Sequence, residues 1–306
     1  MKLILTILSF VAVVVTASAA MSVTINPDKD AFVRALAPTY NYGGGGALSV
    51  SGPNTTTATN GAIDSFISFN TAAMVTTFNS DFGANNWVIT SAMLNLTINQ
   101  APGNAVFNSG SGMFGIRWIA NDTWTEGTGT PMVPTMNGIT YNEETTYLNP
   151  SLDTNLGAYT FTVGDTSLSC PLALPTSFVT NMEAGGEVGL FMTAIDPRVG
   201  FVFYSRQFSG LASTHPALVV TATLPPPQPS ITSVSLSGAN LVLTAANGVA
   251  GGTYYVLTST NAATPPVQWT PIMTNELASS GNFTITVPNA VNLTTPAPQF
   301  FTLLIY

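Results

Sequence analysis

"VITSAMLNLTI", residues 88–98, carries the pattern that decides the fold. Leu94 and Leu96 alternate with their neighbours, so one side of an extended strand faces a core and the other faces water. The same period of two recurs in residues 159–163 and 283–287. Glycine-rich turns separate these runs. The sequence therefore predicts an all-β protein, built as a jelly-roll-like antiparallel β-sandwich.

Three further segments refine this prediction. "FVFY", residues 201–204, is apolar throughout and predicts a central strand that is buried on both faces. Residues 71–78 and 175–186 have apolar side chains at near-helical spacing and end near a glycine. We expect one or two short helices there, laid across the end of the sandwich.

A proline-rich segment divides the chain. "LPPPQPS", residues 224–230, has four prolines and favours an extended spacer. Alternating strands are predicted on both sides of it. We expect a β-sandwich at 21–224, a linker at 225–230 and a second small β-sandwich at 231–306.

The first twenty residues predict export. Lys2 precedes an apolar run at 3–15, and "ASAA" at 17–20 is typical of a cleavage site. We interpret residues 1–20 as a signal peptide, with an uncleaved anchor as the alternative. The run is shorter than the roughly 20 residues that span a bilayer. No later segment is long and apolar enough to do so, and the predicted location is extracellular or at the cell surface.

Composition excludes several functions. Only 7% of the residues are charged and the net charge is −8, so the basic surface that nucleic acid requires is missing. The single His215 and single Cys170 exclude metal sites built on histidine and cysteine. Cys170 is expected to be a buried small hydrophobe, and His215 a turn residue before a strand.

"NDTWTEGTGTP", residues 121–131, places Trp124 near Glu126 in a chain poor in charge. If the segment enters a strand, the two side chains share one face, which favours a structural corner over a ligand contact, and both over catalysis. A buried carboxylate needs a partner. We expect a largely buried Arg206 to pair with Asp30 or Glu126.

"NYGGGG", residues 41–46, is predicted to be a loop that requires unusual backbone angles. It lacks the Lys-Ser or Lys-Thr of a phosphate loop. Tyr40, Asn41 and Tyr42 place two aromatic rings and an amide on one loop and are candidate ligand contacts, with packing of the loop as the alternative. Asp28 and Asp30 are candidate ligands of a structural calcium ion, and no other cofactor is expected.

Four segments together resemble the DNRLRE-type domain, which is grouped with carbohydrate-binding module family 96. They are "KDAFVRALAPTYNYGGGGALSV" at 29–50, the strand at 88–98, "DTWTEGTGTP" at 122–131 and "FYSRQFSGLASTHPALVVTAT" at 203–223. The chain departs from the family at 63–70, where an arginine-bearing strand is common, and at Gln207, where an acid often stands. Binding of uronates is therefore not carried over.

The resemblance implies a secreted, non-catalytic protein that binds a polysaccharide or cell-surface glycan, with Trp124 among the candidate contacts. Two alternatives stay open. One is a structural or adhesive protein of the cell surface or matrix without a defined ligand. The other is a polysaccharide lyase or hydrolase. Residues 231–306 are similar to small β-sandwich tail domains of secreted bacterial proteins of Verrucomicrobia type.

Overall fold

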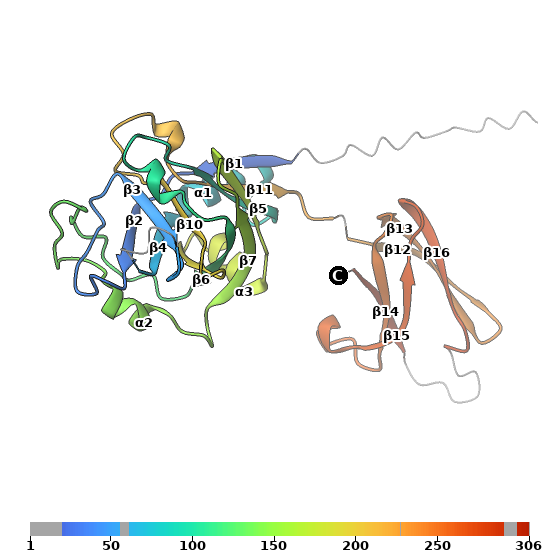
Figure 1. The fold of residues 1–306 in the computed structure, drawn as a ribbon. Helices are drawn as coiled ribbons and strands as arrows, with labels where there is room; N and C mark the ends of the chain where they lie inside the picture. The colour runs from blue at the N-terminus through green and yellow to red at the C-terminus, as the bar shows by residue number, and fades with distance from the viewer. Residues whose placement is uncertain (1–19, 56–60, 227, 291–298, 306) are drawn as a thin grey trace, which may run out of the picture. The chain divides into compact units, whose positions relative to one another are not determined.

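The computed structural model describes residues 20–55, 61–226, 228–290 and 299–305 (Figure 1). The predicted signal peptide lies outside them, apart from Ala20. The chain divides into two compact units, and the boundary in the sequence lies between Leu224 and Pro225.

The first unit contains two antiparallel sheets. The small sheet has the order β1 (Met21–Ile25), β11 (Ala217–Thr223), β5 (Val88–Thr97), β8 (Ser167–Leu172). The large sheet has the order β10 (Gly200–Tyr204), β3 (Ala47–Ser51), β4 (Ile63–Asn70), β9 (Glu187–Ala194), β6 (Gly112–Ile119), β7 (Thr154–Phe161), and β2 (Lys29–Arg34) also pairs with β4.

The inner faces of these sheets form the main core. Leu94 and Leu96 of β5 are buried, and Asn95 between them is only partly covered. They pack in one cluster with side chains of the large sheet, including Phe114 and Phe201. Burial of each such side chain contributes about 1.5–3 kcal/mol. The predicted antiparallel β-sandwich is thereby confirmed.

Strands β2, β4 and β9 of the large sheet are also buried on their outer face. Ile67 of β4 points into the main core, whereas Phe66 points outward and packs against Trp124 with ring centroids 5.7 Å apart. Residues 120–148 supply the covering layer, which includes the helical turns η3 (Tyr141–Glu143) and α2 (Glu144–Tyr147). Because both faces are covered, β4 shows no alternation of apolar and polar residues.

The strand predicted from "FVFY" is not central. It is β10, which stands at the end of the large sheet, although Phe201 and Phe203 are fully buried. Asn99 donates its backbone N–H to the Val202 carbonyl over 2.8 Å, and Val202 donates its own to Asn108 Oδ1 over 2.8 Å. A loop therefore covers the edge that a further strand would occupy. An apolar run indicates burial but does not identify the covering neighbour.

Both predicted helices are present. They are α1 (Ala72–Phe82) and α3 (Thr176–Glu183), and each buries two side chains: Met74 and Phe78 in α1, Phe178 and Met182 in α3. All four belong to the main core. Gly83, with φ of +92°, follows α1.

The second unit is a smaller sandwich. One sheet has the order β12 (Ser230–Ser237), β13 (Asn240–Gly248), β16 (Gly281–Val287), and the other β15 (Thr270–Glu276), β14 (Thr253–Ser259), β17 (Phe300–Ile305) (Figure 1). Tyr254, Val256 and Leu243 are fully buried in its core. Across the described parts of both units, no helix is long and apolar enough to cross a membrane.

Candidate functional site

Glu126 joins three distant segments of the first unit. Its carboxylate accepts two hydrogen bonds from Arg206, from Nε over 2.7 Å and from a terminal nitrogen over 2.5 Å. It also accepts the backbone N–H of Asp30 over 2.7 Å and the Gln207 amide over 2.8 Å. The structure thus brings together the three residues for which the sequence predicted an ion pair. Arg206 is less buried than expected, since 34% of its side chain is exposed.

Asp30 lies beneath this pair and is fully buried. Its Oδ2 accepts the backbone N–H of Arg206 over 2.7 Å, whereas its buried Oδ1 has no hydrogen-bond partner. Burial raises the pKa of Asp30 to about 7, and the backbone hydrogen bond from Arg206 opposes that rise. Asp30 therefore holds the chain in place at the end of β10 and does not face solvent.

Asn41 organises the glycine-rich loop from within. Its amide nitrogen donates to the carbonyls of Glu126 and Ile139 over 2.7 and 2.9 Å. Its amide oxygen accepts the backbone N–H groups of Gly43 and Gly129 over 3.1 and 3.2 Å. The side chain is fully buried and every hydrogen-bonding position is used. Asn41 thus fastens two loops to each other.

Within residues 41–46, Gly43 and Gly44 permit a close approach of two backbones, which corrects the prediction of unusual backbone angles. None of the four has a positive φ. A Cβ on Gly43 would stand 1.8 Å from the Glu126 carbonyl oxygen, and one on Gly44 would stand 2.5 Å from that of Thr128. Only a residue without a side chain lets the two backbones meet at these distances.

Trp124 belongs to the outer layer. No strand follows it, because residues 120–130 have no regular secondary structure, so the assumption that this segment enters a strand is wrong. The ring is 2% exposed, and Lys29 Nζ lies 4.8 Å from its centroid. Lys29 also forms an ion pair with Glu187 over 2.7 Å. These contacts give Trp124 a packing role at this position.

The candidate calcium ligands are held apart by other partners. Asp30 is engaged by Arg206, whereas Asp28 is exposed, beside Lys29 and Glu187. Although the Asp28 side chain is exposed, partial desolvation by the surrounding chain and the nearby Glu187 raise its pKa. Among the described residues, no group of three or more His, Cys, Asp or Glu side chains is arranged to hold a metal ion.

The other polar candidates have packing positions. Cys170 is 1% exposed, and burial raises its pKa to about 12. His215 lies at the turn before β11, with Nε2 3.0 Å from the Phe208 carbonyl. Within the described part of the chain, neither side chain forms a hydrogen bond or ion pair with an acidic or basic side chain.

Two acidic side chains, Asp64 and Glu144, lie together on the outer side of β4. Asp64 is 5% exposed and shares a side-chain hydrogen bond with Glu144 of α2. Burial raises the pKa of Asp64 to about 6. Burial and then the Asp64 charge raise that of Glu144 to about 8. Two adjacent carboxyl groups in this setting hold a proton between them.

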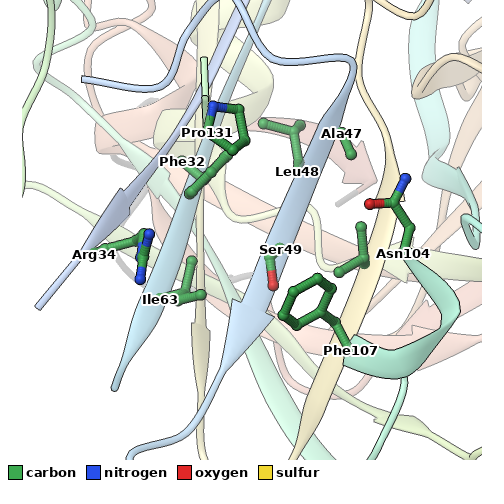
Figure 2. A pocket seen from close by; sticks show the side chains of 10 residues that line it. Phe32, Arg34, Ala47, Leu48, Ser49, Ile63, Asn104, Phe107 and Pro131 are labelled. Atoms are coloured by element: carbon green, nitrogen blue, oxygen red, sulfur yellow. The ribbon is translucent and has the colours of Figure 1, made fainter. Parts of the chain in front are cut away.

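A cavity of about 140 Å³ lies between β2 and β3 (Figure 2). It exists because β3 pairs with β4 only at Ser51 and Ile63 and then diverges. Its apolar lining comes from Phe32, Ala47, Leu48, Ile63, Phe107, Pro131 and Val202, and its polar lining from Arg34, Ser49 and Asn104. Figure 2 shows Arg34 and Phe107 on opposite sides of this space.

The predicted sugar contacts lie near this cavity but do not line it. Tyr42 is 3% exposed and stacks on Phe32, with ring centroids 4.7 Å apart and planes inclined by 6°. The Arg34 guanidinium lies 5.6 Å from the Tyr42 ring centroid. Tyr42 therefore supports two residues of the cavity wall. Tyr40 is 43% exposed.

Sequence reasoning missed the residues that line the cavity. Asn104 and Phe107 lie in and beside η2 (Ala105–Phe107), a short turn with no pattern of its own. Only the fold brings them opposite Arg34. No sequence signal marks such a convergence.

Comparison with known proteins adds little. No family model and no curated protein matches the chain, so the DNRLRE-type family is not established for it. The crystal structure of a β-1,2-glucanase from Parabacteroides distasonis aligns with 88% of this chain at 12% identity and a TM-score of 0.17. The alignment covers 32% of that enzyme. A TM-score this low carries no argument about fold or function.

Proposed function

We propose that this is a secreted, non-catalytic protein that binds a polysaccharide, and that the cavity between β2 and β3 takes one sugar unit. The observation that carries the proposal is the lining of this cavity. An aromatic ring, an amide, a hydroxyl and a guanidinium converge on one concave apolar space. The resemblance to a carbohydrate-binding family supports the same reading.

The chemistry of the lining suits a sugar ring. The Phe107 ring offers a flat apolar surface to the C–H face of the ring. Asn104 both donates and accepts hydrogen bonds, and Arg34 donates them. The Ser49 hydroxyl donates to the Phe201 carbonyl over 3.0 Å, which leaves its oxygen to accept. At about 140 Å³ the cavity is smaller than the roughly 300 Å³ of a drug-sized site. We therefore expect one ring or one chain end to bind.

The positions of the acidic residues support binding without catalysis. Glycoside hydrolysis uses two carboxyl groups on either side of the scissile bond. Glu126 is engaged by Arg206, and Asp64 lies beneath α2 with Glu144. None of these three lines the cavity.

A glycan array probed with the chain from Met21 onward tests the proposal. We expect saturable binding to a polysaccharide, weakened about tenfold by Phe107→Ala because a stacking surface is lost. Val106→Ala is the matched control, because Val106 is the neighbour of Phe107 in η2 and is 58% exposed outside the cavity lining. Tyr40→Ala tests on the same array whether Tyr40, the exposed tyrosine directly before the glycine-rich loop, contributes to glycan binding.

Each other outcome favours a named alternative. Binding to no glycan on the array would favour a structural or adhesive protein. Release of reducing or unsaturated ends from plant or algal polysaccharides would favour a lyase or hydrolase. Export is tested by sequencing the amino terminus of the protein collected outside the cells, for which we expect Met21 as the first residue.

A further inference from the structure

The second unit has a groove of its own on the outer side of one sheet. It has a volume of about 430 Å³ and is lined by Tyr255, Leu257, Val267, Trp269 and Pro271. This volume lies within the roughly 300–1,000 Å³ of small-molecule sites. The groove belongs wholly to the second unit, and its residues do not contribute to the cavity between β2 and β3.

The strands position the two aromatic rings. Tyr254 is fully buried in the core, so its neighbour Tyr255 points to the outer face of β14. Trp269 follows the turn η5 (Pro266–Gln268) directly before β15, and its Nε1 donates to the Thr264 carbonyl over 2.6 Å. This bond orients the indole ring, and the ring remains partly exposed.

Threonine hydroxyl groups lie on the same face of this sheet as Tyr255 and Leu257. Tyr255 is directly opposite Thr274 of β15, and Leu257 is directly opposite Thr302 of β17. Residues that oppose each other in an antiparallel pair share a face. The outer face of this sheet therefore combines flat apolar surfaces with hydrogen-bonding groups.

Charge narrows the class of ligand. Between Pro225 and Tyr306 the sequence contains one charged residue, Glu276, and no basic residue. Nothing in this unit can neutralise a phosphate, sulfate or uronate group. We propose that the groove is a second binding site, which takes a neutral sugar unit of a polysaccharide by stacking on Trp269 and Tyr255.

Tryptophan fluorescence reports on this site selectively. Trp87, Trp118 and Trp124 are 7%, 8% and 2% exposed in the first unit, and Trp269 is the fourth tryptophan of the chain. Quenching by acrylamide therefore falls mainly on Trp269. The probes are soluble neutral polysaccharides, a β-glucan, a xylan and a galactomannan, each titrated against the chain from Met21 onward.

We expect one of these polysaccharides to protect Trp269 from acrylamide in a saturable manner. Tyr255→Ala should weaken this protection about tenfold and keeps the reporter. Val267→Asp should weaken it similarly without altering a strand, because Val267 lies in η5 and is 74% exposed. Val234→Ala, at a 61% exposed position of β12, is the control and should change nothing.

Three results would overturn the proposal. The first is the absence of protection by all three polysaccharides while acrylamide quenches Trp269. The second is protection that neither groove variant weakens. The third is protection without polysaccharide, which would indicate a segment of this chain or, if it depends on protein concentration, a second copy. Phe107→Ala should leave the titration unchanged, so failure here and failure of the first cavity are distinguishable.

Discussion

The Arg206 side chain connects the end of β10 to two other segments of the first sandwich. It follows β10, yet its guanidinium binds a residue of the covering loop and its backbone N–H binds a residue of β2. A bidentate pair of this kind restricts both partners in position and direction. We call the Arg206–Glu126 ion pair the clamp. Its Glu126 carboxylate also accepts the backbone N–H of Asp30, which would otherwise be an unpaired donor at the edge of β2.

Replacing Arg206 with alanine should destabilise the first unit. Glu126 would keep its hydrogen bonds from Asp30 and Gln207 but would lose its only ion-pair partner among the described residues. Because the pair is partly exposed, we expect a loss of about 2 kcal/mol, between exposed and fully buried pairs. The melting temperature should fall by roughly 4–8 °C in calorimetry. Arg117→Ala, at an exposed position of β6, is the control, and an equal loss there would contradict the clamp.

The raised carboxyl pKa values predict an unusual pH dependence. Asp30, Asp64 and Glu144 have folded-state pKa values of about 7, 6 and 8, above those of the unfolded chain near 4. Between these values the native state holds more protons than the unfolded state, so its stability falls as the pH rises. We expect the urea midpoint of the first unit to decrease from about pH 4 to about pH 8. Asp64→Asn should flatten this profile, and a midpoint that increases with pH would exclude the assignment.

At the scale of elements, loops complete the large sheet. Glu126 binds the backbone of β2, and Asn99 and Asn108 bind the backbone of β10. Strand edges with unpaired backbone groups invite association with other chains. Side chains and loops on these two strands take the place of neighbouring strands.

The glycine-rich loop provides a sharp test at this scale. Gly43→Ala would place a Cβ 1.8 Å from a backbone carbonyl, whereas Gly45→Ala would meet its nearest atom at 3.4 Å, an ordinary contact. We expect Gly43→Ala to cost about 3 kcal/mol through overpacking. The change at Gly45 should stay within about 0.5 kcal/mol. Chemical denaturation of both variants measures the difference, and equal midpoints would show that the loops separate easily.

At the scale of the whole molecule, the two cores are separate in composition. Among the described residues, the main core and the outer layer consist of residues before Leu224, and the core of the second unit consists of residues after Pro225. We therefore expect residues 21–224 to fold alone. The fragment should show one cooperative thermal transition with dispersed amide signals in a proton–nitrogen NMR spectrum. A molten or aggregating fragment would show that the tail completes the first core.

Local patterns in the sequence predicted the parts of this protein that depend on local physics. Alternation of apolar and polar residues predicted strands such as β5, because such a strand has one face in the core and one face in solvent. Proline content marked the boundary beside Leu224, and the scarcity of charged residues led us to expect that Arg206 would pair with Asp30 or Glu126. A buried carboxylate needs a hydrogen-bond donor or a cation as its partner, and the sequence contains few basic residues.

The tertiary structure decided the rest, because it depends on which distant surfaces meet. "FVFY" gave no sign that a loop rather than a strand covers β10. The glycines of residues 41–46 could not reveal that their neighbour is the backbone at Glu126. The cavity beside Phe107 and the groove at Trp269 arise from strand divergence and strand pairing. Long-range packing sets such geometry, and a one-dimensional pattern does not record it.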